Sequence, residues 1–330
     1  MEAIDTQTVL TRWWGRSFAA SGMTFLLRIL LAVSLLGAGS SCSKTSRAAT
    51  AEYPKVLQYA FIPSQEELQD NSVRIEHMRQ HLERDLHLPI QMIPVSAYAT
   101  TIEAMRAGKV DIATFGPFGY IIASSGAGAE AIIAYGDSKG ELGSYNSVIV
   151  VPTDSPLRSI ADLKARSREV VFEFADPAST SGNLMPRVYL QSIGIDPERD
   201  FKKTVYAGAQ VATALTVAAH KVDAGAMSLT VLMRLSHLRK ISENDLHVLW
   251  KSPPIPATPI TVRRSLPADL KERIRQSLLS IPRTDAVLWE ELKKYYMRPE
   301  MTFIAVNDSA YDSLRAFAGN VKGIELAEGR

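Results

Sequence analysis

Cysteine is almost absent from this chain of 330 residues, in which Cys42 is the only one. One thiol excludes an internal disulfide framework, an iron–sulfur cluster and a cysteine-rich zinc site. A charge excess is absent as well, since 37 Lys and Arg balance 35 Asp and Glu, and this argues against nucleic acid as a partner. The remaining composition, 46% hydrophobic and 22% charged, is that of a globular protein. The length corresponds to about two domains of roughly 150 residues each.

The chain also lacks an apolar run long enough to span a membrane. The apolar stretch near the N-terminus covers only residues 29–39, whereas a membrane-spanning helix needs about 20 apolar residues. Basic residues precede this stretch, the last of them Arg28, and the small residues 39–41 follow it. A basic region, a short apolar region and small residues are the layout of a secretory signal peptide.

Cys42 comes directly after these small residues, and this position resembles the lipobox of bacterial lipoproteins. In that family the cysteine carries the lipid and begins the mature chain. Gly39 stands where the lipobox usually has leucine, and the alternative is an ordinary secretory signal next to a free cysteine. We expect residues 1–41 to be a lipoprotein-type signal peptide and Cys42 to be lipidated. Residues 42–52, which are small and polar, are then a flexible tether at the periplasmic or extracellular face of the cytoplasmic membrane.

The rest of the chain alternates between two hydrophobic patterns. Short runs of β-formers at residues 56–61, 110–115, 148–151 and 170–174 are separated by stretches with helical spacing. This alternation predicts an α/β fold with mostly parallel sheets that are covered on both faces. Two α/β units fit better than one, and the proline-rich segment 252–259 is the clearest break between them.

Motifs for common enzyme chemistry are missing. The sequence contains no phosphate-binding P-loop, no zinc-protease motif and no nucleophile elbow. Residues 126–131 match a dinucleotide-binding fingerprint only superficially, because they follow a helical stretch. His77 and His81, four residues apart on one helix, have metal-binding spacing, but a solvated face is the expectation on a helix so rich in Arg and Gln. We therefore expect no enzyme, no metal and no cofactor.

One turn from strand to helix does indicate a ligand. The strand 170–174 runs into Ser179, Thr180 and Ser181, and helical spacing resumes at Leu184. Three hydroxyls beside the free N–H groups of a helix N-terminus can bind an oxyanion without Lys or Arg. The alternative is that one serine caps the helix and the other two have no role.

These motifs together are similar to the periplasmic phosphonate- and phosphite-binding proteins of ABC importers. The similarity covers about residues 53–320, and besides the turn its matching segments are residues 98–105, 108–117, 145–150, 154–163, 207–225 and 250–256. The resemblance implies a two-lobed periplasmic-binding-protein-like fold of type II. Its ligand cleft lies between lobes that are joined by two crossover strands. Residues 53–147 with 259–330 would form the first lobe, and residues 148–258, crossovers included, the second.

The resemblance also assigns the ligand site. In the family, two tyrosines close over the ligand, and the turn with three hydroxyls, which we call the hydroxyl turn, holds its oxygens. The residues of this sequence at the ligand positions are Tyr98, Tyr145, Ser179, Thr180, Ser181, Gln210 and Thr258. Gln210 stands where the family commonly has histidine, so it offers a neutral donor in place of a titratable one. Thr230 and Thr258 are the best-spaced candidates for the acidic residues that hold a ligand amino group, and neither is acidic. A plain oxyanion is therefore favoured over an aminoalkyl phosphonate.

The function implied is a lipid-anchored solute-binding protein that captures a small phosphorus oxyanion (phosphonate, phosphite or phosphate) and delivers it to an ABC permease. Two alternatives remain open. The same fold could report an anion to a membrane sensor kinase, or the chain could be a secreted two-lobed α/β enzyme acting on a phosphorylated substrate. The enzyme would need a general base or a nucleophile in the cleft.

Overall fold

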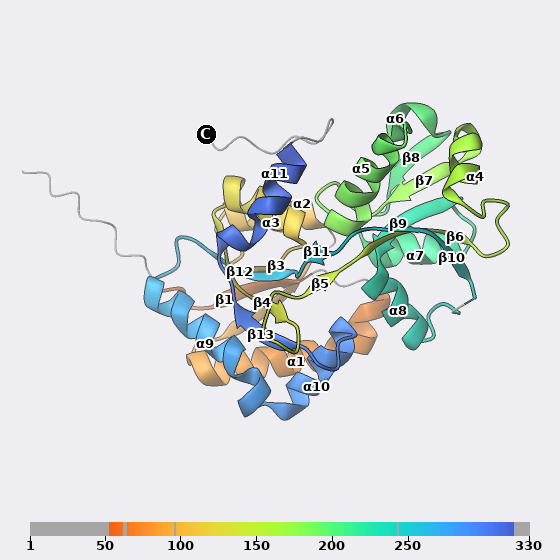
Figure 1. The fold of residues 1–330 in the computed structure, drawn as a ribbon. Helices are drawn as coiled ribbons and strands as arrows, with labels where there is room; N and C mark the ends of the chain where they lie inside the picture. The colour runs from red at the N-terminus through yellow and green to blue at the C-terminus, as the bar shows by residue number, and fades with distance from the viewer. Residues whose placement is uncertain (1–52, 62–64, 96, 243, 320–330) are drawn as a thin grey trace, which may run out of the picture. The chain divides into compact units, whose positions relative to one another are not determined.

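The computed structural model describes residues 53–61, 65–95, 97–242 and 244–319, which belong to one compact unit, residues 50–330. The predicted signal peptide, the tether and Cys42 lie outside the described residues. Within these ranges no helix is both long enough and apolar enough to cross a membrane. The described chain forms two large β-sheets, each with helices on both faces (Figure 1).

The first sheet has six strands in the order β13-β4-β12-β3-β1-β2. Strand β1 pairs in parallel with β2 and β3, whereas β12 runs antiparallel between β3 and β4, and β13 is antiparallel to β4. The strands are β1 (Leu57–Phe61), β2 (Ile90–Pro94), β3 (Ile112–Thr114), β4 (Ala129–Gly136), β12 (Pro259–Arg263) and β13 (Thr302–Ala305).

Helices cover both faces of this sheet because successive strand residues point to opposite sides. Leu57 and Ile112 belong to one apolar cluster with the helices α1, α9 and α10, whereas Ala60 and Ala113 belong to another with α2, α3 and α11. The helices are α1 (Gln65–Leu86), α2 (Tyr98–Arg106), α3 (Pro117–Gly126), α9 (Ala268–Thr284), α10 (Ala286–Tyr296) and α11 (Asp312–Gly319), preceded by the 3₁₀ turn η3 (Asp308–Tyr311). We call this sheet with its helices the first lobe.

The second sheet has five strands in the order β10-β6-β9-β7-β8, and with its helices it forms the second lobe. Strand β7 is parallel to β8 and β9, whereas β6 is antiparallel to β9 and β10. The strands are β6 (Ser147–Pro152), β7 (Val171–Phe174), β8 (Lys203–Tyr206), β9 (Ala224–Ser228) and β10 (Leu246–Lys251). The helices are α4 (Ile160–Ala165), η1 (Ser167–Glu169), η2 (Thr180–Leu184), α5 (Met185–Ser192), α6 (Pro197–Asp200), α7 (Gln210–Ala218) and α8 (Leu229–His237).

Two short strands join the lobes. Strand β5 (Ser144–Tyr145) lies on the path from β4 to β6, strand β11 (Ile255–Pro256) lies on the path from β10 to β12, and the two pair antiparallel. The expected two-lobed fold with two crossover strands is confirmed, while the exact residues at which each lobe begins and ends stay predictions. The expectation of mostly parallel sheets is confirmed for β1–β4 in the first sheet and for β7–β10 in the second, which point the same way within each sheet. It is wrong for β6, β12 and β13. Strands β6 and β12 each enter their sheet directly from a crossover, without the helical return that makes a parallel neighbour, and both run antiparallel to their neighbours.

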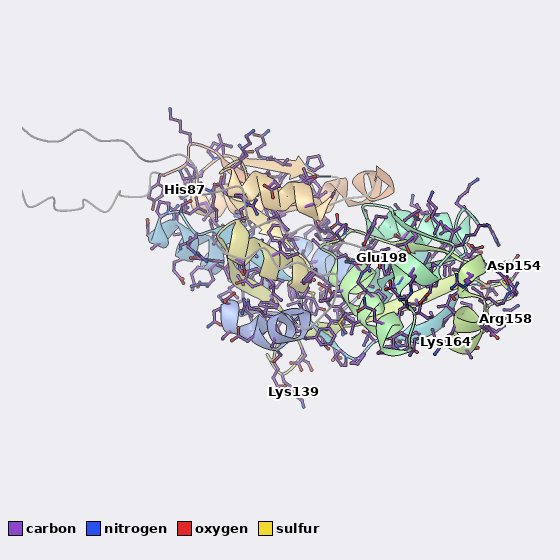
Figure 2. All side chains as sticks on the ribbon, turned by 90° about the horizontal axis from the view of Figure 1, so that it is seen from above. His87, Lys139, Asp154, Arg158, Lys164 and Glu198 are labelled. Atoms are coloured by element: carbon purple, nitrogen blue, oxygen red, sulfur yellow. The ribbon has the colours of Figure 1, made fainter. Side chains whose placement is uncertain are left out.

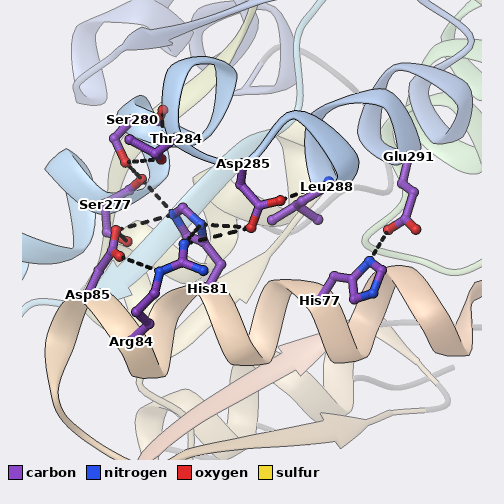
Figure 3. Close-up of polar contacts among 10 residues, drawn as sticks. All are labelled: His77, His81, Arg84, Asp85, Ser277, Ser280, Thr284, Asp285, Leu288 and Glu291. Atoms are coloured by element: carbon purple, nitrogen blue, oxygen red, sulfur yellow. Dashed lines mark hydrogen bonds and ion pairs between the residues drawn. The ribbon is translucent and has the colours of Figure 1, made fainter.

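The expectation of a solvated face around His77 and His81 is also wrong for His81. Its side chain is fully buried where α1 packs against α9 and α10, with Nε2 lying 3.1 Å from the Ser277 carbonyl oxygen (Figure 3). The Asp285 carboxylate lies 3.3 Å from Nδ1 of the same ring. His77 is one-third exposed and pairs with Glu291 at 3.0 Å. Among the described residues, no three His, Cys, Asp or Glu side chains gather as a metal site.

Asp285 combines two roles in this junction. One carboxylate oxygen caps α10 by accepting from the Leu288 N–H at 3.1 Å, and the other faces His81. Burial opposes ionisation of this carboxyl, but the bonds from Leu288 and His81 and the charge of Arg84 outweigh it and hold its pKa below the usual value. The ionised carboxylate therefore stabilises the contact between α1 and α10.

Asp285→Asn should lower the free energy of unfolding by about 1 kcal/mol at pH 7, which is the difference between a charged and a neutral hydrogen bond. Asparagine still caps a helix, so only the charge is lost. Because the pKa is lower in the folded state, the stabilisation is present above the unfolded value of about 3.9 and disappears as the pH falls through the folded value. Urea unfolding at pH 7 and below pH 3 should show the gap to wild type closing in acid.

Asp285→Ala is the matched control, because it removes the cap as well and should cost about 1 kcal/mol more at pH 7. A gap between wild type and Asp285→Asn that is the same at both pH values would show that the charge does not contribute.

Candidate functional site

A cavity of about 180 Å³ lies between the two lobes. Both lobes and both crossover segments contribute to its wall, and its polar side chains include Tyr59, Arg74, Tyr98, Thr114, Tyr135, Tyr145, Gln210, Ser228, Thr230, Arg234, Thr258 and Tyr295. The cavity is therefore the natural place to look for the predicted ligand residues.

Four of the seven predicted ligand residues line this cavity, namely Tyr98, Tyr145, Gln210 and Thr258. They come from the first turn of α2, from β5, from the first turn of α7 and from the segment between β11 and β12. The other three, in the hydroxyl turn 179–181, are at most 1% exposed and lie behind the wall. The structure thus brings all seven to one region, in two layers.

The hydroxyl turn is built by local bonds after β7. The Asp176 carboxylate accepts from the Ala178 N–H at 2.7 Å, and Ser179 caps η2 by accepting from the Gly182 N–H at 3.0 Å. Glycine is required at position 182, because a Cβ there would lie 2.5 Å from the Cβ of Ala175. The turn is therefore held tightly against the end of its own strand.

Gln210 connects the hydroxyl turn to the cavity. Its Nε2 donates to Ser179 Oγ at 3.3 Å, and its Oε1 lies 3.4 Å from the donating Ser181 hydroxyl. The same Oε1 accepts from the Ser228 N–H at 2.7 Å, where α8 begins. One amide side chain therefore joins the starts of η2, α7 and α8 and separates the serines from the cavity.

Tyr145 approaches the turn from the crossover. Its hydroxyl lies near the side chains of Thr180 and Ser181. Burial raises the pKa of Tyr145 above its usual value, and this outweighs the polar influence of those two side chains, which lowers it. Burial likewise raises the pKa of Tyr135, to about 12. Both phenols stay protonated at neutral pH, so they act as hydrogen-bond donors.

The turn also ties the two lobes together. Thr180 Oγ1 accepts from the Phe118 N–H of the first lobe at 2.8 Å. Asp176 Oδ2 accepts from the Tyr98 N–H at 3.2 Å, and burial raises the pKa of this carboxyl. Sequence reasoning missed Asp176, although an aspartate that follows a strand and precedes Pro177 is a usual turn former.

Two buried N–H groups of this turn have no acceptor. Within the described part of the chain, no backbone or side-chain oxygen accepts from the N–H of Thr180 or Ser181, the first two residues of η2. Both residues are at most 1% exposed. Buried N–H groups are nearly always paired, so this pair marks a place for an acceptor from outside the chain.

Two basic residues line the described wall of the cavity. Arg74 and Arg234 line it, and no Asp or Glu is among the described residues of its wall. Exposed charged residues outside this wall include Lys139, which projects from the first lobe, and Asp154, Arg158 and Lys164, which lie at the far end of the second (Figure 2). Sequence reasoning missed both arginines, because no local motif distinguishes them from the many other basic residues on helices.

Comparison with known families decides the assignment. The profile of the family described as the periplasmic substrate-binding protein of the phosphonate ABC transporter matches residues 59–317. This range covers most of the chain, including both lobes and both crossovers. The chain belongs to the periplasmic phosphonate-binding proteins of ABC transporters.

Individual relatives of this phosphonate-binding protein agree. The phosphonates-binding periplasmic protein of Escherichia coli K12 is 31% identical over 78% of this chain and 75% of its own. The phosphate-import protein PhnD of Mycolicibacterium smegmatis is 29% identical over 74% of this chain and 77% of its own. The crystal structure of a binding protein of an ABC phosphonate transporter from Pseudomonas aeruginosa superposes with a TM-score of 0.71, 25% identity and coverage of 84% of this chain and 92% of that one.

Proposed function

We propose that this phosphonate-binding protein captures a small phosphorus oxyanion at the turn 179–181 and delivers it to an ABC permease. The observation that carries the proposal is the pair of buried N–H groups of Thr180 and Ser181 without an acceptor. They stand at the start of a helix that continues from η2 through α5, where the helix dipole favours negative charge. The oxygens of a phosphonate, phosphite or phosphate are acceptors of this kind.

Binding requires an exchange of hydrogen bonds at the turn. The Gln210 amide and the Tyr145 hydroxyl now contact the serine and threonine hydroxyls. An oxyanion that replaces these contacts would accept from the freed hydroxyls, from Gln210 Nε2 and from Tyr145. Hydrogen bonds to a charged group contribute about 1.5–3 kcal/mol each, so a few of them suffice for micromolar or better affinity.

The lack of carboxylates in the described wall of the cavity favours a plain oxyanion over an aminoalkyl phosphonate. Thr230 and Thr258 line the cavity, and no carboxylate of the described residues is available there to hold an ammonium group. The names of the two relatives cover both phosphonates and phosphate, so the family resemblance alone leaves the ligand within this class.

The same wall supports binding over catalysis. An enzyme on a phosphorylated substrate needs a general base or an activated nucleophile near the reacting atoms. The described wall of the cavity contains neither His, Lys nor Cys, and its tyrosines Tyr135 and Tyr145 stay protonated because burial raises their pKa values. Capture and release, without chemistry, fits these residues.

Thr180→Ala tests the anion site. It should weaken binding of whichever of phosphate, phosphite or methylphosphonate binds wild type most tightly, by about tenfold to a hundredfold in isothermal titration calorimetry. Thr180→Ser, which keeps the hydroxyl, should stay within about threefold of wild type. Ser192→Ala is the matched control, because its hydroxyl bonds only within the other end of α5. Equal affinities of Thr180→Ala and wild type would place the ligand elsewhere.

The proposal includes a lipid on Cys42, which would hold the protein at the outer face of the cytoplasmic membrane. It is supported by the position of this single cysteine directly after a signal-like stretch.

Cys42→Ser removes the acceptor thiol and should move the protein from the membrane to the soluble fraction, with its ligand affinity unchanged. Fractionation of cells expressing each version, followed by intact-mass analysis, measures both location and lipid. Recovery of the serine variant in the membrane fraction at wild-type levels would rule out the anchor.

A further inference from the structure

The cavity is larger than the proposed ligand group needs. A tetrahedral oxyanion at the hydroxyl turn would lie next to Gln210 and Tyr145, whereas Arg74 of α1 and Tyr295 of α10 belong to the first-lobe end of the same wall. The rest of this cavity of about 180 Å³ leaves room for a substituent on the phosphorus. The side chains at the first-lobe end of the wall therefore determine which substituent is accepted.

Arg74 is the residue at this end whose charge is not balanced within the described chain. Its guanidinium carbon lies 3.9 Å from the centre of the Tyr295 ring, and its Nε is buried without any hydrogen-bond partner. Arg79, one turn further along α1, has the opposite environment, because it bonds the carboxylates of Glu76 and Glu83. Buried polar groups are normally satisfied, so the unpartnered Nε of Arg74 requires its own explanation.

A second guanidinium approaches the same ring from the other lobe. Arg234 of α8 lies 4.4 Å from the Tyr295 centroid and donates to the Tyr295 carbonyl oxygen at 3.2 Å. The two guanidinium groups therefore hold the Tyr295 ring in place beside Arg74. The charge of Arg74 attracts an anionic substituent there and repels an ammonium group.

We propose that Arg74 forms a second anion subsite, which selects phosphonates that carry a carboxylate on their carbon chain. The inference rests on the proposed function, since it assumes that the phosphorus group occupies the turn 179–181. The planar guanidinium, already oriented by its stacking on Tyr295, matches the two oxygens of a carboxylate. The neutral side chains of Thr114 and Thr230 lie in the same wall and can donate to the same group.

Isothermal titration calorimetry with methylphosphonate, phosphonoacetate, 3-phosphonopropionate and 3-aminopropylphosphonate tests the subsite. One of the two carboxylates should bind wild type about tenfold to a hundredfold more tightly than methylphosphonate, and the amine more weakly. In Arg74→Gln this preference should fall to within about threefold. Arg74→Lys keeps the positive charge but lacks the two parallel N–H donors of the guanidinium, so it should retain part of the preference for the carboxylate. Arg106→Gln, at the exposed end of α2, controls for the loss of one positive charge and should keep the whole preference.

Each result separates the subsite from the anion turn. The subsite alone would be overturned if methylphosphonate binding depends on Thr180 but a carboxylate on the ligand does not increase the affinity. The same holds if the carboxylate increases the affinity equally in Arg74→Gln. Failure of every phosphorus oxyanion to bind wild type would overturn both proposals. Thermal unfolding of the Arg74 variants within a few degrees of wild type confirms that a lost preference is not a lost fold.

Discussion

The buried start of one helix sets the constraint on which the account of this protein depends. The N–H groups of Thr180 and Ser181 are out of contact with water and have no acceptor in the described chain. An unpaired buried N–H costs about 1–3 kcal/mol, so two of them in one turn are a substantial local cost. The cost is recovered only when an acceptor arrives, and the helix dipole makes an anion the best one.

The fold explains why this turn can serve as a contact between lobes as well as an anion site. The Thr180 hydroxyl accepts from Phe118 of the first lobe, and Asp176 of the same turn accepts from Tyr98. The two crossover segments that contain β5 and β11 join the lobes covalently, and Arg234 of the second lobe also contacts Tyr295 of the first. A ligand at the turn therefore acts where the lobes meet, and we expect binding and hinge closure to be coupled.

Local patterns predicted the α/β alternation and the hydroxyl turn, whereas the two lobes and the residues Tyr98, Tyr145, Gln210 and Thr258 were predicted from the family resemblance. The strand-to-helix turn at residues 174–184 was visible because β-formers, hydroxyls and helical spacing follow one another directly. The reversed directions of β6 and β12 were not visible, because they depend on the crossovers and not on the composition of a strand. The burial of His81 was missed for a similar reason: two helices almost two hundred residues further along the chain cover it. The approach of Arg74 and Arg234 to one ring was missed as well, because Tyr295 lies far from both in sequence and contacts them only through packing.

The central claim is that the N–H groups of Thr180 and Ser181 donate to a phosphorus oxyanion, and nuclear magnetic resonance measures this directly. In ¹⁵N-labelled protein saturated with the tightest-binding phosphorus oxyanion, scalar coupling across a hydrogen bond connects a donor nitrogen to ³¹P. The account predicts coupling from the amides of Thr180 and Ser181, with large downfield shifts of both protons. Coupling from other amides, with the signals of these two unchanged on saturation, would contradict it.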